Sequence, residues 1–170
     1  WCKLLQDGKF MGKDELPSKI TSEGLLDNKK RKFKLNGIPD IVIKFKEKGF
    51  GIYDFKTTNI KPYKAEDYRY QLEAYAQIFA NPGSLKKTST PKLLPINQMG
   101  IIQFEPSELV SHNKKEHNMK FEVSFSPLKR DEKDFYHHIT KLIDLIEKPN
   151  PPKFSDDCSL CQFTEINSNL

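Results

Sequence analysis

The sequence has few cysteines and no long apolar run, and each shortage excludes a class of protein. Three cysteines in 170 residues are too few, and odd in number, for a disulfide framework, and they fit a reducing compartment. No run of about 18 apolar residues could form a transmembrane helix, and no signal segment opens the chain. We therefore expect a soluble, cytoplasmic protein without a membrane partner. Trp1 is not an initiator methionine, so we also expect a truncated N-terminus.

Two common catalytic motifs are missing as well. The chain has no G-x-x-x-x-G-K-[ST] loop, which excludes a built-in ATP-driven motor. It has no G-x-S-x-G nucleophile elbow, and nothing around Cys158 marks that thiol as a nucleophile. Any catalysis therefore has to rest on other polar groups.

The composition is that of one globular domain with a basic surface. Hydrophobic residues make up 36% of the chain, and twelve Phe and six Tyr supply bulky core material. We expect a single domain over 1–170, with its core in 31–147 and a tail at 148–170 that carries a C-x-x-C pair. The net charge of +5 is compatible with a polyanionic partner, although lysine-rich surfaces also simply keep proteins soluble.

The order of periodic segments predicts the fold class. Strands are expected where β-branched and aromatic residues dominate, and helices where apolar residues recur at spacings of three, four and seven. The expected strands cover 31–36, 38–45, 50–58, 96–106 and 119–127, and the expected helices cover 66–79 and 131–147. This order of strands and helices indicates an α/β (α+β-like) domain with a mixed central β-sheet flanked by helices.

The stretch GIPDIVIKFKEKGFGIYDFKTTN places charges inside an apolar hairpin. If its turn centres on Glu47, antiparallel pairing puts Asp40 opposite Asp54. Side chains alternate along a strand, so Lys56 projects from the same face as Asp54. The apolar side chains of the hairpin are then expected to pack the other face; they are Ile41, Ile43, Phe45, Tyr53 and Phe55.

Two facing carboxylates need a cation. No Arg lies in the local sequence, and a ligand set of oxygens alone favours Mg²⁺ or Mn²⁺ over Zn²⁺. Lys56 could then hold an attacking water or help to deprotonate it. The alternative from the residues alone is a hairpin whose charges point to solvent, with Lys56 neutralising one aspartate.

These residues resemble a known family. GIPD, then DFK fourteen residues after its aspartate, and then QLEAY on the next helix are similar to the motifs of the PD-(D/E)XK nuclease superfamily, in its RecB-like branch. The resemblance implies a restriction-endonuclease-like core and metal-dependent hydrolysis of DNA phosphodiesters in repair, recombination or processing, whether exo or endo. A helicase or repair complex is then a possible partner. A catalytically inactive nucleic-acid-binding module with the same fold is the alternative, and a purely structural or protein-interaction domain is a third option.

The resemblance also assigns roles to residues. Asp40, Asp54 and the backbone carbonyl of Phe55 would bind Mg²⁺ or Mn²⁺, and Lys56 would position the water. The Gln-x-x-x-Tyr motif, Gln71 to Tyr75, would steer substrate phosphates or brace the site. Without the family, Tyr75 would be read as a core aromatic residue. Arg69 could also meet DNA from the start of the same helix.

The sequence departs from the family in two places. Many relatives supply a further ligand from an N-terminal helix, for which Glu15 and Glu23 are the only stand-ins here, with Glu23 carried as a candidate ligand. Some relatives hold an iron–sulfur cluster on four cysteines, whereas this chain has only Cys2, Cys158 and Cys161. We therefore expect neither a cluster nor a Zn²⁺ ion at the Cys158–Cys161 pair.

Overall fold

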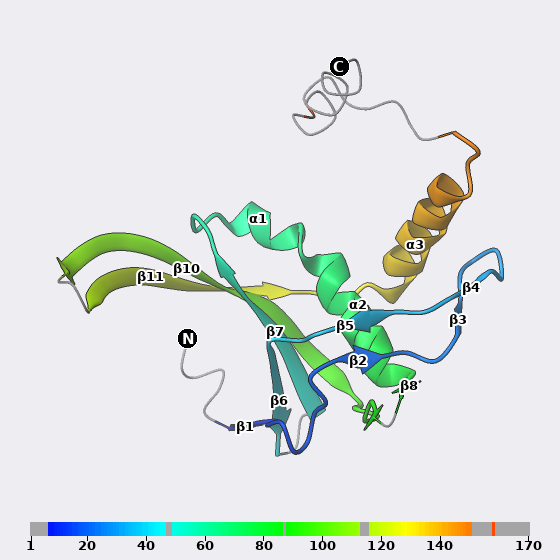
Figure 1. Ribbon diagram of the computed structural model, residues 1–170, viewed down its shortest axis with the longest axis horizontal. Coiled ribbons are helices and arrows are strands. Elements are labelled where there is room, and N and C mark those ends of the chain that lie inside the picture. Colours follow the sequence, from blue (N-terminus) through cyan, green and yellow to red (C-terminus); the bar gives the residue numbers. More distant parts are fainter. Residues whose placement is uncertain (1–6, 47–48, 87, 113–115, 151–157, 159–170) are drawn as a thin grey trace.

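A mixed five-stranded sheet forms the centre of the protein (Figure 1). The computed structural model describes residues 7–46, 49–86, 88–112, 116–150 and 158. The strand order is β1-β6-β7-β10-β11, and only the β7–β10 pair is parallel. Their bounds are Gly8–Phe10, Ile41–Phe45, Gly49–Thr57, Ile96–His112 and His117–Leu128. The predicted fold class, a mixed sheet with helices beside it, is confirmed.

Short strand pairs surround this sheet. They are β2 (Ile20–Thr21) with β5 (Asn36–Gly37), β3 (Leu25–Leu26) with β4 (Lys32–Phe33), and β8 (Ser84–Leu85) with β9 (Thr88–Ser89). Ile20 is fully buried and Leu25 is 6% exposed, so segments ahead of residue 31 also contribute to the core.

Helix α2 (Arg69–Ala80) covers one face of the sheet (Figure 1). Its Leu72, Ala76 and Phe79 pack in one buried cluster with Ile52 and Ile101 of the sheet. The shorter α1 (Pro62–Glu66) precedes it and ends at Asp67, so the helix predicted over 66–79 begins three residues too early. No helix in the described part of the chain is long and apolar enough to cross a membrane.

The β6–β7 hairpin has the predicted register. Ile41 pairs with Tyr53, Ile43 with Gly51 and Phe45 with Gly49. Odd-numbered side chains of the hairpin form a second buried cluster with Ile102 of β10, on the face away from α2; the hairpin members are Ile43, Phe45 and Tyr53. Phe55 was expected in this cluster, but it is 42% exposed, and it lies beyond the first residue pair of the two strands, Ile41 with Tyr53.

Strands β10 and β11 are longer than predicted and leave the sheet as a two-stranded arm (Figure 1). Pairing with β7 stops at Phe104, so beyond that residue the two strands pair only with each other. His112 and His117 lie between the predicted strands 96–106 and 119–127, but they are paired residues at the ends of β10 and β11. Along β11 apolar residues alternate with polar ones, which is typical of a half-buried strand, yet Met119 is 48% exposed and Phe121 is 43% exposed.

Helix α3 (Glu132–Ile146) was predicted over 131–147 with one apolar face. Phe135 is buried, but Leu142 is 40% exposed and Ile146 is 80% exposed, so the second half of this face is not part of the described core. The helix begins with a cap in which the Asp131 carboxylate accepts a hydrogen bond from the Asp134 N–H at 2.9 Å.

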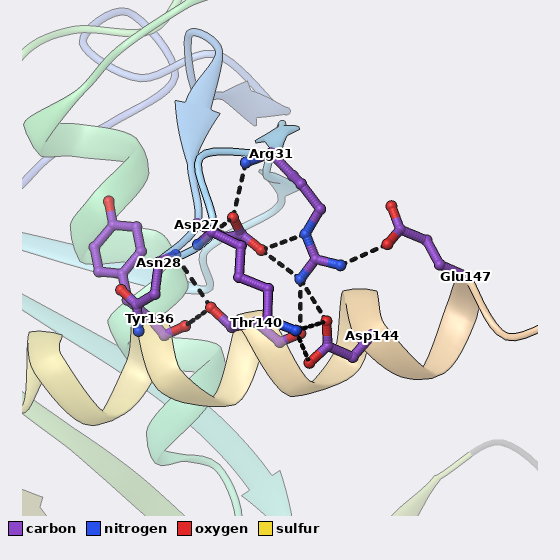
Figure 2. Close-up of polar contacts among 8 residues, drawn as sticks. Asp27, Asn28, Arg31, Tyr136, Thr140, Asp144 and Glu147 are labelled. Atoms are coloured by element: carbon purple, nitrogen blue, oxygen red, sulfur yellow. Dashed lines mark hydrogen bonds and ion pairs between the residues drawn. The ribbon is translucent and has the colours of Figure 1, made fainter.

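A network of ion pairs connects α3 to the turn between β3 and β4 (Figure 2). The Arg31 guanidinium contacts the carboxylates of Asp27 at 2.6 Å, Asp144 at 2.9 Å and Glu147 at 2.5 Å. Asp27 also accepts hydrogen bonds from the backbone N–H groups of Lys29 and Arg31. Burial acts to raise the pKa of Asp27, but the hydrogen bonds from Arg31 outweigh it and lower that pKa. Asp27 therefore stays ionised and holds Arg31 toward the helix.

Candidate active site

The two aspartates meet at the end of the β6–β7 hairpin. Continuing the register by one pair beyond Ile41 and Tyr53 places Asp40 opposite Asp54, as predicted. The Asp40 Oδ2 atom accepts a hydrogen bond from the Phe55 N–H at 2.9 Å, which brings this carboxylate against β7. Asp54 is only 2% exposed, whereas Asp40 is open to solvent. The hairpin thus joins one buried and one accessible carboxylate.

Pro39 lies beside this pair and lacks the N–H that a strand residue would donate. The same register places Pro39 opposite Phe55, and a proline has no N–H to donate to the sheet. The N–H and C=O of one strand residue point to the same side, so the Phe55 carbonyl faces the side on which Asp40 binds. Pro39 therefore cannot donate a hydrogen bond to the Phe55 carbonyl. The oxygen of that carbonyl is suited to bind a cation.

Lys56 lies on the same face as Asp54. Its Nζ atom is 2.6 Å from Asp54 Oδ2 and 4.6 Å from the centre of the Tyr68 ring. Burial acts to lower the pKa of Lys56, but the contact with Asp54 outweighs it and raises that pKa above its usual value. Lys56 is therefore an ammonium group that can donate hydrogen bonds, which favours holding a water over deprotonating it.

The environment of Asp54 makes ionisation of its carboxyl group less favourable than in water. Burial raises the pKa of Asp54, the neighbouring Lys56 ammonium acts in the opposite direction, and the negative charge of Asp40 raises the pKa again. The net shift is upward, so the anionic form is held less favourably than in water. A divalent cation between the two carboxylates would remove this penalty, because it is an opposite charge close to both.

Gln71 and Tyr75 brace the buried aspartate from α2. Gln71 Nε2 donates to Asp54 Oδ1 and to the Tyr75 hydroxyl oxygen, each at 3.0 Å. The Tyr75 hydroxyl in turn donates to the Ile38 carbonyl at 3.1 Å. These residues lie one helical turn apart, so the same face of α2 reaches both strands of the hairpin. Tyr75 is 8% exposed, which suits a positioning role better than direct contact with a large substrate.

Gly37 makes room for this bracing helix. A Cβ atom at Gly37 would overlap Cε1 of the Tyr75 ring, whereas a Cβ atom at Gly24 would meet nothing within 4 Å. The chain just ahead of Pro39 can therefore lie directly against Tyr75 only because residue 37 has no side chain.

Replacing Gly37 with Ala tests this close packing. The added methyl group should displace the Tyr75 ring, weaken its bond to Ile38 and destabilise the protein by about 1–3 kcal/mol. Chemical denaturation of Gly37→Ala and of the control Gly24→Ala measures the effect. Equal stability of the two variants would show that Tyr75 does not pack tightly on residue 37.

Two candidate residues are not brought to the aspartate pair. The Glu23 N–H donates to the carbonyl of Asn81, at the far end of α2 from Gln71. Ten helical residues span about 15 Å, so the structure does not place Glu23 among the ligands. Arg69 is committed to Asp134 of α3 at 2.7 Å and to Glu66 at 3.3 Å, and it makes no contact with Asp54 among those found in the described residues.

The remaining ligand candidates also lie elsewhere. Glu15 pairs with Lys9 at 3.3 Å on the surface. Cys2 and Cys161 fall outside the described residues, so the expectation about a cluster or zinc stays a prediction. Within the described ranges no group of three or more His, Cys, Asp or Glu side chains could hold a metal. At the end of the hairpin, the candidate protein ligands for a cation are the two carboxylates and a backbone carbonyl.

The chemistry of this donor set fits a hard divalent cation. All the donors are oxygen atoms, and Mg²⁺ is commonly held by one or two carboxylates with the remaining positions filled by water and substrate. Asp54 Oδ2 is buried and has no hydrogen-bond donor of good geometry among the described residues, although Lys56 lies beside it as an ion pair. Beyond the contact with Lys56 and the hydrogen bond from Gln71, the Asp54 carboxylate still has lone pairs for a cation.

Gln103 is a polar residue at the site that sequence reasoning missed. It pairs with Lys56 across the parallel β7–β10 ladder and is 0% exposed. The available signal was its position in the apolar run MGIIQF, where a lone glutamine interrupts a buried strand.

Comparison with known proteins identifies the class. A family model of the PD-(D/E)XK nuclease superfamily matches residues 8–166, and both the mixed sheet and the helices agree with the restriction-endonuclease-like fold. No curated protein and no solved structure matches the chain. The chain belongs to the PD-(D/E)XK nuclease superfamily, and this membership indicates metal-dependent nuclease activity.

Proposed function

We propose that this protein is a Mg²⁺- or Mn²⁺-dependent deoxyribonuclease of the RecB-like branch. The observation that carries the proposal is the convergence of Asp40, Asp54 and Lys56 at one end of the β6–β7 hairpin. The Gln71 and Tyr75 pair that braces Asp54 supports the assignment to that branch, since it is the Gln-x-x-x-Tyr motif of the sequence.

The proposed cation site consists of Asp40, Asp54 and the Phe55 carbonyl. A divalent cation, when bound there, polarises the scissile phosphate and offsets the negative charge that develops during hydrolysis. Asp54 is fixed by Gln71, while Asp40 is exposed and can meet a ligand that arrives from solvent. This division supplies both a rigid ligand and an entry path.

The other site residues have separate proposed roles. Lys56, as an ammonium group, holds the attacking water by donating a hydrogen bond to its oxygen. Gln71 and Tyr75 act as positioning residues that keep Asp54 and the chain ahead of Asp40 in place. Arg69 could contact the DNA backbone only after giving up part of its ion pairing with Asp134, so we assign it no substrate contact.

A DNA substrate fits the charge of the chain. The net charge of +5 and the many lysines favour binding to a phosphate backbone, which is weakly dependent on sequence and strongly dependent on salt. The proposed setting is DNA repair, recombination or processing in the cytoplasm, with a helicase or repair complex as partner.

Incubation with DNA tests the proposal. Linear and circular DNA are each exposed to the protein with Mg²⁺, Mn²⁺ or EDTA. We expect cleavage with either metal and none in EDTA, because Lys56 is the one cationic group that the described residues place beside Asp54 to offset the charge on phosphate. Degradation of the linear form alone indicates an exonuclease. DNA binding without cleavage under any metal condition would instead favour an inactive nucleic-acid-binding module.

A further inference from the structure

Two buried polar atoms on one face of the sheet lack a hydrogen-bond partner among the described residues. They are Asp54 Oδ2, whose one contact there is the ion pair with the Lys56 ammonium at 2.6 Å, and Gln103 Nε2. One is an acceptor and the other is a donor. Buried polar atoms are nearly always paired in native proteins, so two complementary exceptions on adjacent strands call for a common explanation.

The β7–β10 ladder places the two side chains near each other. Asp54 pairs with Ile101, and Gln103 lies two pairs further along, opposite Lys56. Side chains two residues apart project from the same face of a strand, so Gln103 emerges on the face that carries Ile101 and Asp54. A diagonal neighbour on an adjacent strand is within reach of a long side chain.

The amide of Gln103 is held in place at its other end. Its Oε1 atom accepts a hydrogen bond from the Ser126 hydroxyl of β11 at 3.2 Å. This contact anchors the amide and leaves the two N–H groups of Nε2 as the unused donors. Because Gln103 is 0% exposed, these donors can meet a small molecule such as water but not a phosphate group of a substrate.

We propose that Gln103 is a positioning residue for the metal-binding carboxylate, and that it acts through one buried water held between its Nε2 atom and Asp54 Oδ2. The water accepts a hydrogen bond from Gln103 and donates one to Asp54, which satisfies both atoms. Gln71 fixes Oδ1 of the same carboxylate from α2, so Asp54 is clamped from the helix and from β10. Lys56 and this water would take the two lone pairs of Oδ2, and Oδ1 keeps a lone pair for a cation beside its bond from Gln71. The inference rests on the proposed metal site.

Gln103→Met is the test variant, since methionine has a similar length and shape but no donor. Partners that orient a metal ligand typically contribute about 10–100-fold to metal affinity. We therefore expect Gln103→Met to bind Mn²⁺ about 10–100-fold more weakly than the wild type, with thermal stability equal or higher because an apolar side chain suits the buried strand. Gln98→Met is the matched control, because Gln98 lies on the same strand and bonds to Tyr53, away from Asp54.

Mn²⁺ titration and a high-resolution crystal structure of the metal-free wild type are the two measurements. Weaker Mn²⁺ binding by Gln103→Met alone, with a water within hydrogen-bond distance of both Gln103 Nε2 and Asp54 Oδ2, supports the inference. Unchanged Mn²⁺ affinity in that variant overturns it while leaving the proposed function intact. If the wild type binds no Mn²⁺, the proposed function fails, and the presence or absence of the water then decides the role of Gln103 by itself.

Discussion

Asp54→Asn should abolish metal-dependent cleavage and at the same time leave the metal-free protein at least as stable as the wild type. The first effect follows from the loss of an anionic ligand at the buried end of the site. A metal ion contributes several kcal/mol to transition-state stabilisation, so the rate should fall by about 10³-fold or more. The second effect follows from the raised pKa of Asp54.

The stability effect has a defined pH dependence. A carboxyl group with a higher pKa in the folded state than in the unfolded state binds its proton more tightly when folded. Folding stability is therefore lost as pH rises from the unfolded-state pKa of about 3.9 through the raised folded-state pKa of Asp54. Asparagine does not ionise, so the stability advantage of Asp54→Asn should appear over this range and then level off.

Thermal unfolding in EDTA from pH 3.5 to 7 measures this difference. The exposed Asp14 gives a control, because Asp14→Asn removes one carboxylate outside the site. A variant that loses cleavage but is less stable than the wild type at every pH would show that Asp54 contributes to the fold through its charge. That result would remove the argument that its buried charge is held for binding a cation.

Lys56→Ala should separate catalysis from binding. Loss of a group that holds the attacking water lowers the cleavage rate by about 10²–10⁴-fold. DNA affinity in EDTA should change little, since Lys56 is one of many lysines in a chain of net charge +5. The metal-free protein should also lose stability, because the Asp54 carboxylate loses its neighbouring ammonium at 2.6 Å.

Single-turnover cleavage and DNA binding are compared for Lys56→Ala and Lys44→Ala. Lys44 is an exposed lysine on β6, so its removal subtracts the same charge without touching Asp54. Parallel losses of cleavage and binding in both variants would indicate that Lys56 acts only through the general positive charge of the surface.

The site geometry could be predicted where local rules determine it. The register of β6 and β7 follows from the short polar turn and from the alternation of apolar side chains, because a slip by one residue would expose Ile43 and bury Lys44. The contact of Gln71 with Asp54 follows from helical spacing together with the family motif.

Other features depend on contacts distant in sequence. Arg31 and Asp144 meet only after the chain has folded, and neither lies in a recognisable motif. Glu23 looked like a ligand candidate by residue type, but strand pairing holds its backbone at the far end of α2. The role proposed for Gln103 rests on its Nε2 atom, which has no partner among the described residues and which no sequence pattern marks. Periodicity reports which face is buried, not which polar groups remain unsatisfied on it.

Mn²⁺ binding measured by the loss of the free-ion electron paramagnetic resonance signal tests the central claim most directly. The claim is that Asp40 and Asp54 together hold one divalent cation. The wild type should bind Mn²⁺ saturably, Mg²⁺ should compete, and both Asp40→Asn and Asp54→Asn should greatly weaken the binding. Binding by both variants with the affinity of the wild type would contradict the account, because the cation would then be held elsewhere in the protein.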